Sequence, residues 1–271
     1  MRRTLLSRRW IGFLVLCLVL AGACVRLGFW QLHRFEDHRA ANARVAHNLA
    51  ATPEPVEKLM TVGGTVDPNT QWRRVTATGE YDVSRQLLVR QRPLDGANGY
   101  EVLTPLVTRS GQALVVNRGW VPAGASATAA PAVPAPPTGQ VSITARLRTS
   151  ETGQPHRPGL PAGQVMSIAV PTIAAELPYP VYGGYAELVE QTPAPKQALA
   201  SLPVDQRSTA LNLAYTVQWW LFAVIIIVGW YFLGRREAQE AQQAQEAKAA
   251  QGHDDGDPDR SQRAASSPRG G

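Results

Sequence analysis

Cysteine is almost absent from this chain, which has only Cys17 and Cys24 among its 271 residues. Both lie in the first apolar stretch, so the polar middle of the chain holds neither a disulfide nor a thiolate metal site. Redox chemistry by cysteine is therefore excluded from that region.

The common catalytic signatures are missing as well. The sequence contains no GxSxG, HExxH, P-loop or GxGxxG motif in a suitable context, and no Ser, His and carboxylate grouping is suggested by spacing. His33, His38 and His47 follow the first apolar stretch, but only the first and third share a helical face, which favours surface positions over a metal site. We predict no catalytic residue, no metal ligand and no enzymatic activity.

The middle of the chain has little net charge. The formal charge of the whole sequence is +6, yet residues 27–210 hold 16 Lys and Arg against 14 Asp and Glu. Nucleic-acid binding would need a basic face on the folded domain, so no nucleic-acid partner is expected. The excess positive charge lies at the termini and beside the apolar stretches, where it reports on membrane topology.

What the chain does have is a long uncharged run at residues 211–233, followed by Arg235 and Arg236. As a helix these 23 residues would rise roughly 34 Å, enough to cross a hydrocarbon core about 30 Å thick. One face of that helix is aromatic and polar, with Tyr215, Gln218, Trp219, Phe222 and Ile226 at helical spacing. Its polar atoms need a partner, which is either the chain's other membrane helix or a docked protein or cofactor.

The first apolar stretch, residues 10–30, follows four arginines and no acidic residue. This positive-inside pattern predicts a cytoplasmic N-terminus. Trp10 and Trp30 would stand about 30 Å apart along a helix, one at each interface of an intact span. The alternative is a cleaved signal peptide or lipoprotein, because Ala21-Gly22-Ala23 before Cys24 resembles a processing site.

The outer end of this first span carries a basic and aromatic face. Arg26, Trp30 and Arg34 are spaced at i, i+4 and i+8, so they stack along one side of a helix. Such a face suits lipid phosphate, and also a cofactor that bears carboxylate groups.

Alternation between apolar and polar residues predicts strands in the middle of the chain. Residues 71–81 and 86–92 form one predicted hairpin, and residues 100–107 and 113–121 form a second. Further elements are a helix from 35 to about 48, strands at 141–147 and 179–189, a short helix within 167–177, and loops at 122–140 and 151–163. The predicted fold class is a membrane protein in which two transmembrane α-helices flank a mainly antiparallel β (α+β) extracytoplasmic domain.

The domain boundaries follow from these elements. We expect a cytoplasmic N-terminus (1–9), a first transmembrane helix (10–30), an extracytoplasmic β-rich domain (31–210), a second transmembrane helix (211–233) and a cytoplasmic tail (234–271). The tail is helical by composition over 237–250 and otherwise largely disordered. The absence of a mitochondrial presequence pattern and the richness in Ala, Arg and Pro favour a multi-pass protein of a bacterial cell membrane.

Three stretches together resemble the surfeit locus protein 1 family, the Shy-type assembly factors of cytochrome c oxidase. They are LGFWQLHR at residues 27–34, a block over 74–122 that contains GEYD, LLVRQR, GYEVLTPL and VVNRGWVP, and LAYTVQWW at 213–220. The resemblance implies an assembly factor of an aa3-type oxidase, which helps haem a to reach or stay in the catalytic subunit. Two alternatives remain: a stable accessory subunit of a respiratory supercomplex, and a membrane-anchored extracytoplasmic enzyme.

One position departs from the family pattern. Many members have a histidine near the entry of the second helix, linked to haem binding, where this chain has Asn212. Asparagine is a poor axial ligand for haem iron, so no resident cofactor is assigned and haem a is expected only as transient cargo. The surface expected to contact haem or the oxidase comprises Tyr215, Gln218, Trp219, Arg26, Trp30 and Arg34, and an axial-histidine spectrum would redirect attention to His33, His38 or His47.

The motif NRGWVP also has a structural interpretation. Gly119 would allow a bulge or a close backbone approach, and Trp120 would fill a gap between the domain and the bilayer. Contact with a partner protein is the alternative.

Overall fold

The computed structural model describes residues 7–124, 131–204, 208 and 210–254. The chain divides into two compact units. One consists of residues 1–39 and 208–271, and the other of residues 40–207.

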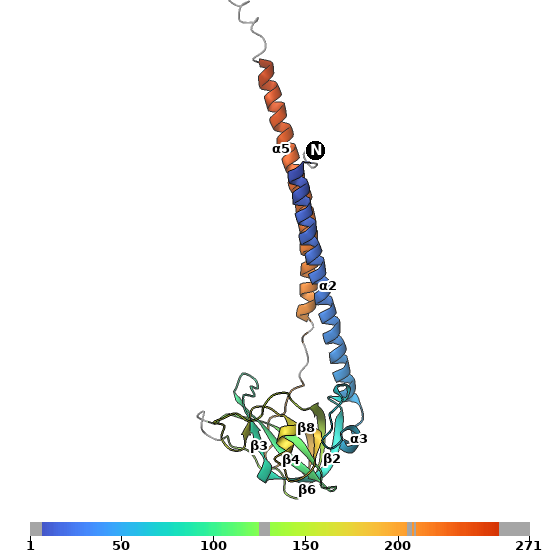
Figure 1. The fold of residues 1–271 in the computed structure, drawn as a ribbon, viewed down its shortest axis with the longest axis vertical. Helices are drawn as coiled ribbons and strands as arrows, with labels where there is room; N and C mark the ends of the chain where they lie inside the picture. Colours follow the sequence, from blue (N-terminus) through green and yellow to red (C-terminus); the bar gives the residue numbers. More distant parts are fainter. Residues whose placement is uncertain (1–6, 125–130, 205–207, 209, 255–271) are drawn as a thin grey trace, which may run out of the picture. The chain divides into compact units, whose positions relative to one another are not determined.

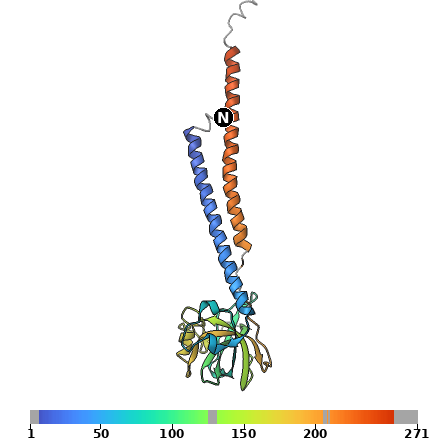
Figure 2. The ribbon, with the colours of Figure 1, turned by 90° about the vertical axis from the view of Figure 1, so that its right-hand side faces the viewer.

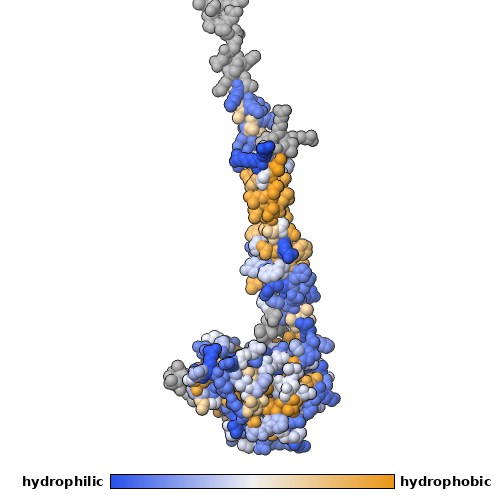
Figure 3. All heavy atoms as spheres, viewed as in Figure 1, coloured by the Kyte–Doolittle hydropathy of each residue, from blue (hydrophilic) through white to orange (hydrophobic). Residues whose placement is uncertain are grey.

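The first unit contains helix α2 (Arg8–Ala50) as far as Arg39, and helix α5 (Ala210–Asp254). These two helices lie side by side and run antiparallel (Figures 1 and 2). The last turns of α2 belong to the second unit. Both are long and apolar enough to cross a membrane, with mean hydropathy of 2.3 and 1.8 over their most apolar windows. Only 22% and 11% of those windows is buried, which does not fit the core helix of a soluble protein. Figure 3 shows the apolar band along this helix pair.

The two helices pack along a seam with a spacing of three and four residues. On α2 the buried or half-buried positions with this spacing are Trp10, Leu14, Cys17, Ala21, Cys24, Gly28, Gln31, Phe35 and His38, and Leu32 is half-buried beside them. On α5 the corresponding positions are Asn212, Thr216, Trp219, Ala223, Ile226 and Trp230. This is the 3.5-residue period of helices that wind around each other, and the small residues in it let the two backbones approach closely.

Aromatic contacts fix the register of the pair. Phe29 meets Trp220 edge-on with ring centroids 5.6 Å apart, and Trp10 meets Trp230 at 6.4 Å. A Cβ at Gly28 would overlap the indole of Trp220. Glycine is therefore required at this crossing point for the indole to lie against α2.

The second unit is built around a closed barrel. Its five strands are β2 (Arg74–Tyr81), β4 (Gly99–Thr108), β5 (Ala113–Pro122), β6 (Gln140–Thr149) and β8 (Val181–Thr192). They are hydrogen-bonded in the order β2-β6-β8-β5-β4, and β2 pairs with β4 through Gly79–Tyr81 to close the ring. Closure leaves these central strands without a free edge along their paired lengths.

Alternating residues of the five strands fill the barrel interior. Val75, Leu114, Val116, Ala145 and Leu147 are completely buried there. Each Val or Leu removed from water in this way contributes about 1.5–3 kcal/mol, before the conformational entropy of ordering it is counted. Helix α3 (Val56–Leu59) covers one part of the barrel with Val56.

Smaller elements cover the outside of the barrel. The sheet is extended by β1 (Glu54–Pro55), β3 (Leu87–Val89) and β7 (Gln164–Val165). A second apolar cluster joins Leu103 and Val115 of the barrel to Ile173 of α4 (Val170–Ala174). The short 3₁₀ helices are η1 (Pro68–Thr70) and η2 (Val83–Arg85).

Two expectations about the sheet need correction. The predicted hairpin between 71–81 and 86–92 is wrong, because β2 pairs with β6, β4 and β1, whereas β3 pairs with β4 and β7. The sheet is mixed: among the described residues, the pairings β1–β2, β3–β7 and β5–β8 are parallel. Alternation identifies a strand and its buried face but carries no information on partner or direction, which is why both errors arose.

Other expectations are confirmed. The strands β4 and β5 form the predicted antiparallel hairpin, and α4 is the short helix expected within 167–177. The helix predicted to reach about Asn48 ends at Ala50, and α5 is helical over the expected 237–250 as far as Asp254. The prediction of disorder for the tail beyond that point lies outside the described residues.

Candidate functional site

The basic and aromatic stripe of α2 lies on the surface of the helix pair. Arg34 stacks over the ring of Trp30, with its guanidinium carbon 5.4 Å from the ring centroid, and Trp30 is 53% exposed. Arg26 is also exposed, and none of the three belongs to the seam with α5. The stripe therefore presents a delocalised cation and an indole on a surface that the other helix does not cover.

The aromatic and polar residues of α5 divide between two environments. Trp219 belongs to the seam and meets Phe222 edge-on at 5.9 Å, whereas Tyr215 and Gln218 are exposed beside it. Packing against α2 is thus the role of Trp219 and Trp220, and Tyr215 stays available for another contact. Among the described residues, no hydrogen bond, ion pair or ring contact joins these α5 side chains to Arg26, Trp30 or Arg34.

An imidazole lies beside Asn212, which sequence reasoning did not foresee. The Nδ1 atom of His38 is 3.2 Å from Nδ2 of Asn212 and 3.4 Å from the carbonyl oxygen of Ser208. When Nδ1 accepts from the Asn212 amide, the ring proton is on Nε2; when Nδ1 instead donates to Ser208, Nε2 is a free acceptor. In that second tautomer the Nε2 atom of His38 is chemically able to ligate a metal.

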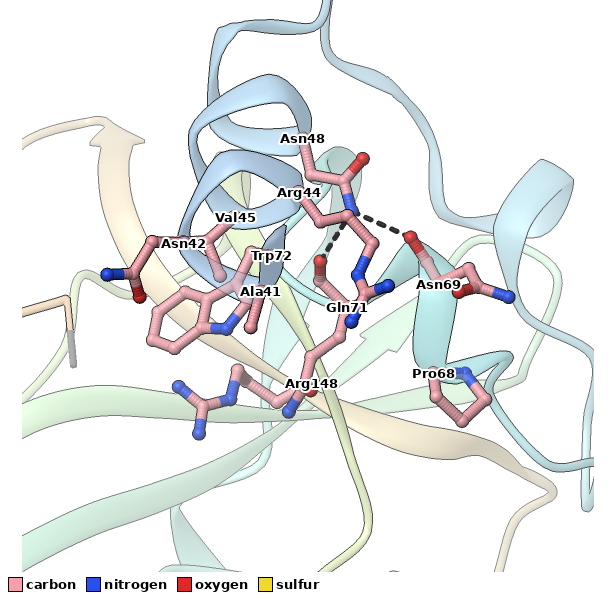
Figure 4. Close-up of a pocket in the computed structure, with 10 residues that line it drawn as sticks. All are labelled: Ala41, Asn42, Arg44, Val45, Asn48, Pro68, Asn69, Gln71, Trp72 and Arg148. Atoms are coloured by element: carbon pink, nitrogen blue, oxygen red, sulfur yellow. Dashed lines mark hydrogen bonds between the residues drawn. The ribbon is translucent and has the colours of Figure 1, made fainter. Parts of the chain in front are cut away.

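The barrel domain has a polar cavity of about 400 Å³ between the last turns of α2 and the start of β2 (Figure 4). Asn48 of α2 anchors this arrangement, because its Nδ2 donates to the carbonyl oxygens of Asn69 at 2.7 Å and Gln71 at 2.9 Å. Arg44 lines the cavity one turn earlier, is exposed, and has no acidic partner among the described residues.

Trp72 forms the opposite wall of this cavity. Its backbone φ is +72°, a left-handed conformation that is uncommon for a bulky residue and is held by the bond from its N–H to the carbonyl of Leu147 at 2.8 Å. The guanidinium carbon of Arg148 lies 3.9 Å from the Trp72 ring centroid, and that of Arg146 lies 5.6 Å from it. The ring and the two arginines thus form one packed group.

Glu187 of β8 neutralises part of this positive charge. Its carboxylate is 2.8 Å from Arg148 and 3.3 Å from Arg146, and its side chain is 7% exposed. Burial raises the pKa of the Glu187 carboxyl group, an effect that the two arginines oppose, and burial lowers the pKa of Arg146. One carboxylate faces two nearby guanidinium groups, and of these Arg148 lines the cavity together with Arg44.

This cavity is suited to an anionic group. Guanidinium groups and side-chain amides recognise carboxylate or phosphate oxygens. The sequence does carry a signal for the site: Arg146 and Arg148 alternate with the interior residues Ala145 and Leu147, which places two arginines on one outer face of β6. Their partner Trp72 is 74 residues away from Arg146, and no spacing rule connects them.

The NRGWVP motif serves the interior of the domain. Asn117 donates to Glu101 at 2.8 Å and accepts from the Gly119 N–H at 3.2 Å, and the indole N–H of Trp120 donates to the carbonyl of Arg92 at 2.6 Å. Trp120 is 9% exposed, so its ring packs inside the domain. The close backbone approach expected at Gly119 is confirmed, because a Cβ there would lie 2.6 Å from the carbonyl oxygen of Ala200.

In sequence, the β-barrel domain comes between the two helices of an antiparallel pair, and polar residues lie in the seam of that pair. This architecture defines a class of proteins but does not identify a reaction. A model of the SURF1 family matches residues 18–224. Uncharacterised SURF1-like proteins of Mycobacterium bovis and Mycobacterium tuberculosis are 32% identical over 229 residues, covering 83% of this chain and 83% of theirs. The chain belongs to the SURF1 family.

A more distant relative has an informative name. The cytochrome oxidase assembly protein SHY1 of Saccharomyces cerevisiae is 28% identical over 96 residues, which is 35% of this chain and 24% of the yeast protein. A SURF1-like protein of Rickettsia bellii is 29% identical over 98 residues, 35% of this chain and 38% of that protein.

Proposed function

We propose that this protein is a non-enzymatic assembly factor for an aa3-type cytochrome c oxidase. The observation that carries the proposal is membership of the SURF1 family over residues 18–224, together with the partial match to the yeast assembly protein. The exposed polar and aromatic side chains of the helix pair form the surface that contacts the catalytic subunit of the oxidase within a bacterial cell membrane.

A deletion strain without a paralogue tests this role. Haem a absorbance in difference spectra of its membranes should fall, while the absorbance of the bc-type cytochromes is retained. Normal haem a absorbance would refute the assembly role. If the protein instead purifies in fixed stoichiometry with the finished oxidase, the accessory-subunit hypothesis replaces it.

The topology proposed here has both helices spanning the membrane, with residues 31–210 outside and both termini in the cytoplasm. The antiparallel packing of α2 and α5 supports this arrangement, since antiparallel spans place the two termini on the same side. In a background that lacks Cys17 and Cys24, an impermeant thiol reagent added to intact cells should label Thr152→Cys but not Gln242→Cys; both positions are exposed. Labelling of Gln242→Cys in sealed cells would overturn the topology.

Haem a is proposed as a transient cargo of the helix pair. Support comes from the exposed Tyr215 and from the stripe of Arg26, Trp30 and Arg34, where aromatic stacking adds about 0.5–1.5 kcal/mol per pair and arginine meets propionates. These contacts are weaker than an axial bond, so the purified protein should retain haem a at well below one equivalent.

Two variants separate contact from ligation. Asn212→His should increase haem retention because it restores an imidazole at this point of α5, and the absorption spectrum should show axial histidine. In the unaltered protein, a full equivalent of haem with an axial-histidine spectrum would contradict weak contact. Loss of that spectrum in His38→Ala would then identify His38, which lies beside Asn212, as the ligand.

The cavity at the end of α2 is proposed to receive an acidic group of the oxidase. Arg44 lines it without an acidic partner among the described residues. Arg44→Glu should lower the haem a content of complemented cells, whereas Arg157→Glu, at an exposed arginine away from the cavity, should not. Equal complementation by both variants would remove the cavity from the proposal.

A further inference from the structure

A second cavity, of about 690 Å³, lies between the first turns of α2 and the middle of α5. Its apolar wall includes Trp10, Phe13 and Leu233, and its polar wall includes Arg9 and Arg236. The volume is in the range of pockets that enclose small ligands, about 300–1,000 Å³. All of these residues belong to the helix-pair unit.

Trp10 joins the cavity to the seam between the helices. The residue is only 7% exposed, fixed by edge contacts with Phe13 at 5.7 Å and Trp230 at 6.4 Å, and its Nε1 atom has no hydrogen-bond partner among the described residues. Buried indole N–H groups usually find an acceptor. That nitrogen has no accessible surface, so the indole N–H points into the seam and the ring offers the cavity an apolar surface beside Arg9 and Arg236.

The acidic residues of the cavity limit the chemical class of a molecule that could bind there. Glu237 and Glu240 also line it, and Glu240 lies 3.9 Å from Arg236. A purely anionic group would meet the two arginines but would also face two carboxylates. A headgroup that carries a phosphate and an ammonium group satisfies both sets, because the phosphate accepts from the two arginines and the ammonium donates to the carboxylates.

We propose that this cavity binds a zwitterionic glycerophospholipid with a primary amine, of the phosphatidylethanolamine type. The phosphate lies between Arg9 and Arg236, the ammonium group faces Glu237 and Glu240, and the acyl chains follow Trp10, Phe13 and Leu233. Tryptophan and arginine at the end of an apolar span mark the headgroup region, where basic pockets between helices hold lipid headgroups. The inference rests on the proposed span of both helices and is independent of the role in oxidase assembly.

Native mass spectrometry of the full chain in a mild detergent tests the site. The probes are phosphatidylethanolamine, phosphatidylcholine, whose quaternary amine donates no hydrogen bond, and phosphatidylglycerol, which has no amine. Phosphatidylethanolamine should bind at least tenfold more tightly than either of the others. Equal binding of all three, or preference for phosphatidylglycerol, would overturn the proposal.

Variants locate the binding. Arg9→Gln with Arg236→Gln should weaken phosphatidylethanolamine binding at least tenfold, and Arg235→Gln, whose side chain stacks on Tyr231 instead, is the matched control. Glu237→Gln with Glu240→Gln should abolish the preference over phosphatidylcholine while leaving phosphate-dependent binding.

Unchanged preference in the glutamate variant, or equal effects of Arg235→Gln and the double arginine variant, would refute the assignment. Release of the protein from membranes by an alkaline carbonate wash would instead refute the underlying spans.

Discussion

Gly119 is a position of the barrel domain where a side chain would meet both an unfavourable backbone conformation and a close backbone neighbour. Its φ of +132° lies in a region that L-residues rarely adopt, which would cost alanine about 1–3 kcal/mol. An alanine Cβ would also lie 2.6 Å from the carbonyl oxygen of Ala200 and 2.8 Å from Cβ of Leu199. Relief of that overlap requires the segment around Ala200 to move away from β5.

Two backbone hydrogen bonds depend on that segment. The Trp120 N–H donates to the Ala200 carbonyl at 2.8 Å, and the Ala200 N–H donates to the Trp120 carbonyl at 3.1 Å. With a net value of about 0.5–1.5 kcal/mol each, their loss raises the total cost of Gly119→Ala to about 2–6 kcal/mol. This is a large share of the 5–15 kcal/mol typical of a folded domain.

Urea unfolding of the full chain in detergent, followed by tryptophan fluorescence, measures the effect. Gly111→Ala is the matched control, because Gly111 also has a positive φ of +77° but open space around its Cβ position, so only about 1–2 kcal/mol is expected. Hydrogen exchange should show that the Trp120 and Ala200 amides lose protection in Gly119→Ala alone. Equal destabilisation by both variants, with protection intact, would refute the reasoning from close approach.

Three further predictions concern other parts of the molecule. Gly28→Ile should lower the free energy of unfolding in detergent by about 1–3 kcal/mol, because the new side chain overpacks against α5. Gly22→Ile is the control, since a Cβ at Gly22 meets nothing within 4 Å. Equal effects of the two variants would contradict the packing of α2 against α5 at Gly28. Leu147→Ala, at a completely buried position in the barrel, should cost about 2–5 kcal/mol in urea unfolding, and a loss below about 1 kcal/mol would argue against a packed interior. Burial raises the pKa of the Glu187 carboxyl group above its ordinary 4.5, so the native state holds that proton more tightly than the unfolded chain does. The contribution of Glu187 to the free energy of unfolding therefore falls as the pH rises from 4.5 through the raised pKa. Glu187→Gln should flatten that part of the stability profile, and an unchanged slope would assign the dependence elsewhere.

The sequence was sufficient for features that depend on local pattern. Uninterrupted hydropathy located the apolar parts of α2 and α5, and alternation located β2, β4, β5, β6 and β8 to within a few residues. The β4–β5 hairpin was also predictable, since a turn with Gly111 joins two adjacent strands over a short loop. The motif residues that identify the family can likewise be recognised in the sequence.

Tertiary structure alone decided which distant segments meet. Five half-apolar strands bury one interior together, and this shared burial selects their partners. It makes β6 rather than β3 the neighbour of β2, pairs β5 in parallel with β8, and closes the barrel through β4. The contact of His38 with Asn212 likewise depends on the register of two helices that are 174 residues apart at this point. Alternation and helical spacing specify which face of an element is buried, whereas the partner of that face is selected by the packing of the whole unit, which no local pattern encodes.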